Sequence, residues 1–361
     1  MATELEPLRK TDGSRIETLD AWRDRRQAML ETVLTVEYGR PPAVPEVEAR
    51  HVSVEERAIE GLTENAQLIT AELAFGPGNA LTMKAGCWLL GDRVGAAPIV
   101  LAVEPVWWED PFIKKGIARR LLARGYGFAG FDHNALASYE DPALRAARDA
   151  YPEADWGVVC IAAWWCSVTM NWLETLEGVD AKHVALWSHS RRGKSVYLAG
   201  ALDERFAAVV PHMSGMGGSA SYRARGKGAQ ELEQLLERYW LHERVYEYID
   251  REEALPLDQH WLAALIAPRP LYMHVGTRDY WGNPKGELTT YREALAVYQW
   301  LGHPERLGIH FVDAEHVDPG SPEGAYSWET LCDFLDWHFK GIKPDKPFSP
   351  EEQEALVGTL K

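Results

Sequence analysis

The stretch from His183 to Asp203 constrains the fold of this chain more than any other. It begins with the apolar run Val-Ala-Leu-Trp, which predicts a buried strand. It ends in a helical pattern whose inward face can hold Val196, Leu198, Ala199 and Leu202. Ser190 lies between the two, with small or flexible neighbours. We therefore expect a strand that turns sharply into a helix and lifts the serine hydroxyl clear of a sheet.

In α/β-hydrolases a serine at such a turn is the nucleophile, and the turn is marked by glycines two residues before and two residues after it. Here those positions are Ser188 and Arg192, and the nearest glycine is Gly193. The generic motif therefore leaves two interpretations open. Ser190 is either a nucleophile or a serine that caps the start of a helix.

A longer string surrounds Ser190 and continues beyond the predicted helix. It reads Ser-Arg-Arg-Gly-Lys-Ser, then Ala-Gly-Ala-Leu-Asp-Glu-Arg-Phe, then Ser214-Gly-Met-Gly-Gly218. This string closely resembles carbohydrate esterase family 15, the glucuronoyl esterases, whose own string is Gly-Cys-Ser-Arg-x-Gly-Lys. Bacterial members often have histidine before the serine, as His189 is here. The resemblance extends from about residue 40 to about residue 340, and it implies a nucleophilic Ser190.

The remaining pattern predicts the α/β-hydrolase fold, with a mostly parallel central sheet and helices on both faces in a three-layer sandwich. Alternating residues at 48–57, 66–75 and 80–90 predict antiparallel strands at one edge of the sheet. The apolar run Ile99–Val103 predicts a buried parallel strand. Further strands are expected at 128–131, 207–210, 271–275 and 308–312, and helices at 17–37, 113–124, 157–177, 287–301 and 324–339.

No internal repeat or linker-like change in composition divides the chain, so we expect one domain over residues 1–361. Three of its segments stand apart from the alternating pattern. We expect a helical N-terminal segment at about 1–45, a helical excursion over the active-site edge at about 219–254, and a polar tail at 341–361.

A serine nucleophile needs a histidine that takes its proton and a carboxylate that orients and stabilises that histidine. The α/β-hydrolase order is serine, then acid, then histidine. His316 follows the last predicted strand, where the fold places the base, and the other histidines compete poorly for this role. Ser190 and His316 are therefore our candidates for nucleophile and base.

The acid is where this sequence departs from the family. Many glucuronoyl esterases carry glutamate immediately before Ser-Gly-x-Gly-Gly, and here that position is Met213. The usual hydrolase position follows strand 271–275, where Asp279 begins a run that resembles Asp-x-Trp-x-x-Pro-x-Gly-Glu of bacterial members. We therefore predict Asp279 as the acid. The alternatives are that Asp279 only fixes a turn, and that Glu315 beside His316 is the acid.

Four further residues are candidates for contact with the transition state or the substrate. Arg191 supplies a backbone N–H next to the nucleophile, and the resemblance implies that its guanidinium also reaches the oxyanion. The resemblance also implies that Lys194, one helical turn after Ser190, contacts sugar hydroxyls, and Trp281 is the expected stacking platform. The family's acidic and amide contacts to the uronate fall within 226–240, where Glu231 is the candidate.

The loop at 104–111 lies where α/β-hydrolases place part of the oxyanion hole. It contains Trp107, which either lines a sugar site or covers the core. The 15 tryptophans of the chain are many for its length, and such a surplus suits stacking on sugar rings.

The composition of the chain limits the kinds of molecule that we expect it to bind. A net charge of −16 argues against nucleic acid and anionic membranes, which attract basic patches. The four cysteines lack the spacing of metal ligands, so we expect packed thiols, no metal and no cofactor. The N-terminus has no apolar signal region, which predicts a soluble cytoplasmic protein unless a signal peptide was removed.

These observations predict a serine carboxylic-ester hydrolase that resembles 4-O-methyl-glucuronoyl methylesterases and acts on a small-molecule or oligosaccharide ester through an acyl-enzyme. One alternative is an acetyl-ester deacetylase of the acetylxylan type. Another is a carbohydrate-binding pseudo-hydrolase without activity, which the missing acid at Met213 would favour.

Overall fold

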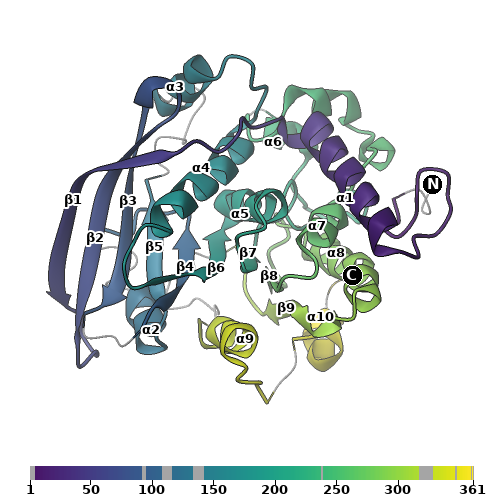
Figure 1. Cartoon of the computed structure of the whole chain (residues 1–361). Helices are drawn as coiled ribbons and strands as arrows, with labels where there is room; N and C mark the ends of the chain where they lie inside the picture. The colour runs from purple at the N-terminus through teal and green to yellow at the C-terminus, as the bar shows by residue number, and fades with distance from the viewer. Residues whose placement is uncertain are drawn as a thin grey trace.

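A twisted sheet runs through the molecule, and helices lie on both of its faces (Figure 1). The computed structural model describes residues 5–91, 95–107, 116–132, 142–236, 239–316, 328–345, 348–358 and 360. Within these residues the sheet has nine strands: β1 (Val47–Ala58), β2 (Asn65–Phe75), β3 (Leu81–Leu90), β4 (Ala97–Ala102), β5 (Gly127–Phe131), β6 (Val179–His189), β7 (Ala208–His212), β8 (Leu271–Gly276) and β9 (Leu307–Val312).

The strand order is β1-β2-β3-β5-β4-β6-β7-β8-β9. The pairs β1–β2, β2–β3 and β3–β5 are antiparallel, and every pair from β5–β4 to β8–β9 is parallel. Parallel neighbours must be joined by crossover connections. The strand order reverses at β5 and β4, so the connections on the two sides of this reversal lie on opposite faces of the sheet. The predicted α/β-hydrolase fold, with antiparallel strands at one edge, is confirmed.

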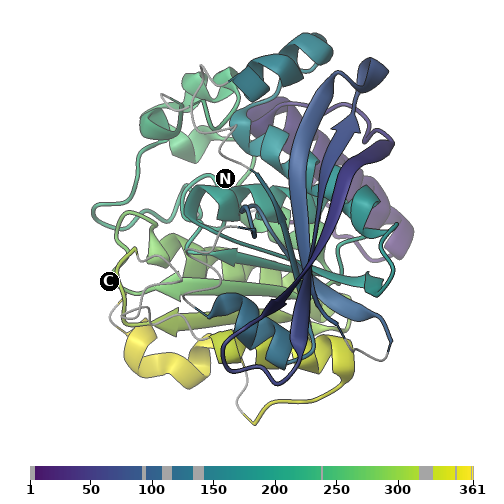
Figure 2. The same cartoon turned by 90° about the vertical axis from the view of Figure 1, so that its left-hand side faces the viewer.

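Successive residues of the parallel strands enter two separate cores, as the two-residue period of a strand requires. In β4, Ile99 and Leu101 pack with α4 (Val158–Leu173) and α5 (Ser190–Leu202). Val100 and Ala102 pack on the other side, where α2 (Ile117–Ala123) and α9 (Trp328–Lys340) lie. Figure 2 shows the helices on either side of the sheet.

The helices follow their sequence patterns closely. Helix α1 (Leu19–Val33) is capped by Thr18, whose hydroxyl accepts from the backbone N–H of Ala21 at 3.2 Å, and it continues into a π-helical turn, Leu34–Tyr38. The other described helices are α3 (Pro142–Ala150), α6 (Leu232–Leu236), α7 (His260–Ile266), α8 (Pro284–Trp300) and α10 (Glu354–Val357). The first residues of the helices predicted at 113–124 and 324–339 lie outside the described residues.

The segment expected as a helical excursion at 219–254 has little regular helix. Its described elements are α6 and two short 3-10 turns, Glu243–Tyr248 and Glu252–Ala254. Loop backbone connects them, because the charged residues here have no apolar stripe long enough to support a longer helix. Its contact with the active-site edge is described below.

The segment 341–361 is more than a polar tail. The backbone N–H of Ile309 in β9 donates to the carbonyl of Phe348 at 3.1 Å, and the Gln353 side chain accepts from the N–H of Phe311 at 2.7 Å. Phe348 itself is buried against Tyr272 and Phe334. One aromatic and one amide side chain therefore dock this otherwise polar segment on the edge of β9.

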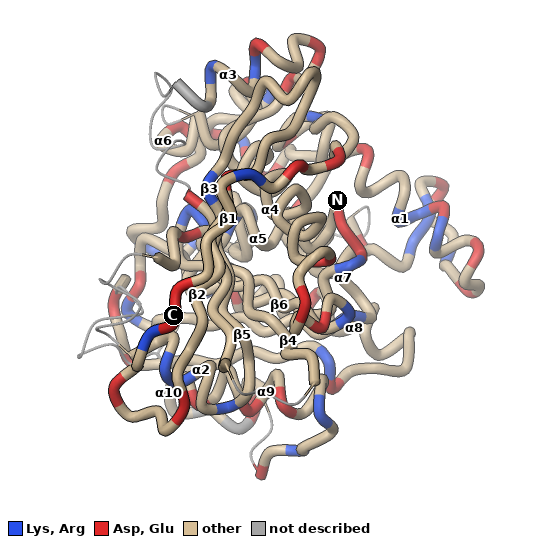
Figure 3. Tube along the Cα trace, turned by 60° about the vertical axis from the view of Figure 1, so that its left-hand side comes forward, with Lys and Arg blue, Asp and Glu red and all other residues tan. Residues whose placement is uncertain are grey.

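The four cysteines are free and buried, as expected, and burial raises the pKa of Cys87 and Cys332 to about 12. Acidic and basic side chains are interspersed along the described trace in Figure 3. No described helix combines the length and the apolar character that crossing a membrane requires.

Candidate active site

Ser190 lies at the turn between β6 and α5, with its backbone in the left-handed region at φ 57°. A side-chain-bearing residue adopts this conformation at a cost of the order of 1 kcal/mol, and such strain concentrates at functional sites. The turn also needs close packing behind it. A Cβ on Gly193 would lie 2.9 Å from Cβ of Ser214 and 3.0 Å from the carbonyl oxygen of Ser188, so the nearest glycine is the one that the elbow requires.

The two positions where the generic motif has glycine carry contacts of their own. Ser188 is fully buried, and its hydroxyl accepts from the backbone N–H of Val103 at 3.2 Å, which joins the ends of β6 and β4. The Arg192 guanidinium lies 2.6 Å from the Glu104 carboxylate. Both side chains thus connect the elbow to the loop after β4, where the fold places part of the oxyanion hole; the rest of that loop, 108–115, lies outside the described residues.

Three side chains that follow three different strands are joined by hydrogen bonds. His316 Nε2 lies 2.8 Å from Ser190 Oγ, and His316 Nδ1 lies 2.8 Å from Asp279 Oδ2. With the proton on Nδ1 donated to the carboxylate, Nε2 is free to accept the serine proton. This is the geometry that activates a serine hydroxyl.

The loop after β8 is shaped around the Asp279 carboxylate. Asp279 is 3% exposed, and its Oδ1 accepts from the backbone N–H of Gly282 at 2.9 Å. A Cβ on Gly282 would lie only 2.4 Å from Oδ2 of Asp279. The absence of a side chain at position 282 therefore makes room for the carboxylate that faces His316.

Neither alternative for the acid position reaches His316 in the same way. The Glu315 carboxylate is exposed and lies 3.6 Å from the Arg278 guanidinium. Met213 is buried, with its side chain packed against Val312 and Ala314. Position 213 is thus filled by an apolar contact beneath the His316 loop.

Two cations of α5 lie over one aromatic ring that sequence reasoning did not single out. Arg191 Cζ and Lys194 Nζ are 5.8 Å and 5.6 Å from the ring centroid of Trp240, within the range of cation–π contacts. Trp240 belongs to the segment 219–254, which therefore contacts the first turns of α5. Several aromatic residues populate this segment, and only the folded chain shows which of them turns toward α5.

Lys194 lies one turn after Ser190 and is 3% exposed. Its ammonium donates to the carbonyl of Ser214 at 2.6 Å and to that of Met216, and burial lowers its pKa to about 7. Glu287 approaches the same loop and accepts from the Ser219 hydroxyl and from the N–H of Gly215, and burial raises its pKa to about 8. Lys194 and Glu287 thus clamp the Ser-Gly-Met-Gly-Gly loop between them.

The remaining predicted substrate residues lie in different settings. Trp281, two residues after buried Asp279, is 44% exposed, and its carbonyl accepts from the N–H of Gln230 at 3.0 Å. Glu231, the next residue after Gln230, is exposed and lies 3.6 Å from Arg225. Trp107 packs on the core cluster with Lys84 4.7 Å from its ring centroid, so covering the core is one role that it has.

Comparisons with known proteins agree on one family. The family model for fungal glucuronyl esterases matches residues 98–302. A carbohydrate esterase of an unknown prokaryotic organism is 27% identical, with 93% of this chain and 89% of that protein covered. A 4-O-methyl-glucuronoyl methylesterase of Schizophyllum commune is 26% identical over 85% of this chain and 76% of that protein.

A solved structure of a carbohydrate esterase family 15 glucuronoyl esterase, from Caldicellulosiruptor kristjansonii, superposes with a TM-score of 0.78 at 27% identity. It covers 96% of this chain and 92% of the other. The family match spans more than half of the sequence and includes Ser190 and Asp279. The chain therefore belongs to the glucuronoyl esterase family and is a carboxylic ester hydrolase.

Proposed function

We propose that this enzyme hydrolyses uronate esters, including esters of 4-O-methyl-glucuronic acid, by forming an acyl-enzyme on Ser190. One observation carries the proposal: His316 contacts Ser190 Oγ and Asp279 Oδ2 at 2.8 Å each, at a serine held in the left-handed region. The relatives named glucuronoyl methylesterases support the choice of acyl group.

Ser190 Oγ attacks the ester carbonyl carbon while His316 Nε2 takes the hydroxyl proton. The Asp279 carboxylate stabilises the imidazolium that forms and keeps its orientation. His316 then gives the proton to the leaving alcohol, and the carbonyl–alcohol bond breaks. Water enters, loses a proton to His316 and attacks the acyl carbon, which releases the uronic acid and regenerates Ser190.

Negative charge develops on the carbonyl oxygen in both steps. The backbone N–H of Arg191, at the first turn of α5, is placed to donate to it, and the Arg191 guanidinium adds a positive charge nearby. The contact of Arg191 with Trp240 supports this role, since it restrains a long side chain at the edge of the site. Arg191→Ala should lower kcat about 100-fold or more, since removal of one oxyanion donor typically costs that much.

Substrate recognition belongs to the exposed rim. Trp281 offers an accessible ring for stacking on the sugar, and Glu231 lies one residue from the backbone contact between the two loops. Lys194 is 3% exposed, so only a small part of its side chain can contact the sugar. Its hydrogen bond to the Ser214 carbonyl gives it a second role, which is to shape the loop at 214–218.

A two-substrate assay tests the proposal. The parent enzyme should hydrolyse benzyl glucuronate with a higher kcat/KM than p-nitrophenyl acetate, and Ser190→Ala should abolish both activities without a change in melting temperature. Trp281→Ala should raise KM for benzyl glucuronate and spare p-nitrophenyl acetate, which offers no sugar ring. A preference for the acetyl ester would favour a deacetylase, and carbohydrate binding without turnover would favour a pseudo-hydrolase.

A further inference from the structure

Four histidines stand side by side across the parallel half of the sheet. In the strand register His189 of β6 pairs with His212 of β7, His212 with His274 of β8, and His274 with His310 of β9. Their ring centroids are 4.9, 4.5 and 5.5 Å apart in that order. These residues lie far apart in the sequence, so the alignment is produced by the register of the sheet.

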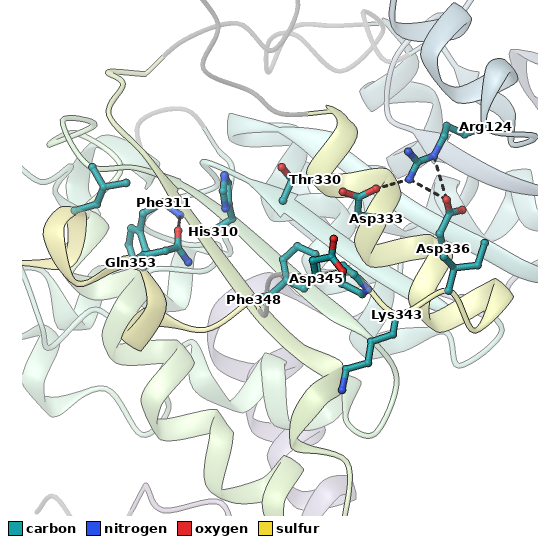
Figure 4. Close-up of a pocket in the computed structure, with 13 residues that line it drawn as sticks. Arg124, His310, Phe311, Thr330, Asp333, Asp336, Lys343, Asp345, Phe348 and Gln353 are labelled. Carbon is teal, nitrogen blue, oxygen red and sulfur yellow. Dashed lines mark hydrogen bonds and ion pairs between the residues drawn. The ribbon is translucent and has the colours of Figure 1, made fainter.

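The four rings share the face of the sheet that α2 and α9 cover. Side chains two residues apart along a strand share a face, and His189 follows Trp187 while His274 follows Tyr272. At its far end the row reaches a cavity of about 640 Å³ that His310 lines together with residues of α9 and the C-terminal segment (Figure 4). At its near end the row meets the active site.

At this end the ring of His189 contacts the ring of His316. The centroids of His189 and His316 are 4.8 Å apart, and their planes are inclined by 33°. His316 is thereby held on three sides, by Ser190, by Asp279 and by the face of His189. His189 is itself enclosed between His316 and His212, and its exposed fraction is only 9%.

We propose that His189 is a positioning residue for the catalytic base: its ring, backed by His212 and His274, orients the His316 imidazole and faces the positive charge that this imidazole gains. The inference rests on the proposed role of His316 as the base. A neutral ring face stabilises a neighbouring cation, whereas a second imidazolium at this distance would repel it.

Burial keeps the other three histidines of the row neutral. It holds the pKa of His212 and that of His274 well below the usual value for histidine, and it lowers the pKa of His310 to about 4. At neutral pH these three residues therefore place polarisable, uncharged rings behind His189. They add no cation that would oppose formation of the His316 imidazolium.

Other charged groups around His316 are few among the described residues. The Asp279 carboxylate contacts it directly and interacts electrostatically with Lys194 and Glu287, and the Arg191 guanidinium lies at the same edge of the site, over Trp240. The neighbouring carboxylate of Glu315 is engaged by Arg278. These groups stay in place when residue 189 is changed, so a change in the titration of His316 reports the ring contact.

The test replaces His189 by a side chain with a ring face and by one without. His189→Leu should lower kcat for benzyl glucuronate about tenfold with little change in KM, and His189→Phe should stay within about threefold of the parent, since a partly desolvated cation–π contact is of this size. The pKa of the His316 ring, followed by NMR, should fall in His189→Leu and hold in His189→Phe. The acid limb of kcat/KM should move to lower pH in parallel.

His310→Phe, at the far end of the row, is the matched control and should leave kcat and the His316 titration unchanged. His189→Gln is a second variant without a ring face should His189→Leu fail to fold. Equal behaviour of the leucine and phenylalanine variants, or an unchanged His316 pKa in His189→Leu, would overturn the inference. The NMR titration does not depend on turnover, so it separates this inference from a failure of the proposed esterase function.

Discussion

Strands β7 and β8 are parallel neighbours, and the residues that follow them face the same loop of His316 with opposite chemistry. Met213, after β7, is buried against Val312 and Ala314. Asp279, after β8, sits in a loop whose Gly282 leaves room for its carboxylate and donates an N–H to it. An acid position therefore needs both a carboxylate and a loop shaped to hold it.

The largest loss of activity is expected for Asp279→Asn, which removes the carboxylate after β8. We expect a loss of about 10⁴-fold in kcat, because the amide no longer fixes the tautomer of His316 or stabilises its charge. Steady-state kinetics on benzyl glucuronate would measure the loss. Glu315→Gln is the control and should cost little, and a near-parental kcat in Asp279→Asn would make Glu315 the first alternative.

A smaller effect should come from Gly282→Ala, which leaves the carboxylate in place and disturbs only its loop. The added Cβ would lie 2.4 Å from Asp279 Oδ2, so the carboxylate must move. A displacement of this kind at a reacting group costs about 10 to 100-fold in kcat. In the Asp279→Asn background the same change should add almost nothing. Additive losses in the double variant would show that Gly282 acts by another route.

A carboxylate can also be introduced at the end of β7, at position 213. Met213→Glu in the Asp279→Asn background should restore kcat about tenfold, because a carboxylate there lies beneath the His316 loop and can supply part of the missing charge. Met213→Gln, which has the same shape without the charge, should restore nothing. Equal rates for the two double variants would mean that the β7 end does not point toward the base.

The smallest effect is expected for Met213→Leu in the otherwise unchanged enzyme. Its volume-conserving change in a buried apolar contact should cost less than about 1.5 kcal/mol in the free energy of unfolding and leave kcat within about twofold. Denaturant unfolding and kinetics would measure both quantities. A large loss of activity would indicate that the Met213 contact positions the His316 loop.

The sequence contained the local features of this enzyme and lacked the nonlocal ones. Apolar runs identified the strands, and the string around Ser190 identified the turn, because strand and helix periodicities are local properties. The pairing of Lys194 with loop carbonyls could not be predicted, since a helical spacing says which face a residue shares and not how deeply the next loop covers it.

The residues that the sequence did not reveal lack a local pattern of this kind. Trp240 is one aromatic residue among several in an irregular segment, and no period there tells which ring turns inward. The row from His189 to His310 depends on the register of four strands that are separate in sequence. Phe348 and Gln353 sit in a polar segment, where two docking residues leave no recognisable pattern.

That docked C-terminal segment also decides what the outer edge of β9 offers to other molecules. The amides of Ile309 and Phe311 would be open to pairing with any extended chain, and here Phe348 and Gln353 occupy them. The segment therefore covers this edge of the sheet and prevents edge-to-edge aggregation there. A truncation before Phe348 would remove it while leaving Ser190, Asp279 and His316 in the chain, and the expected result is an enzyme that starts active and self-associates over time.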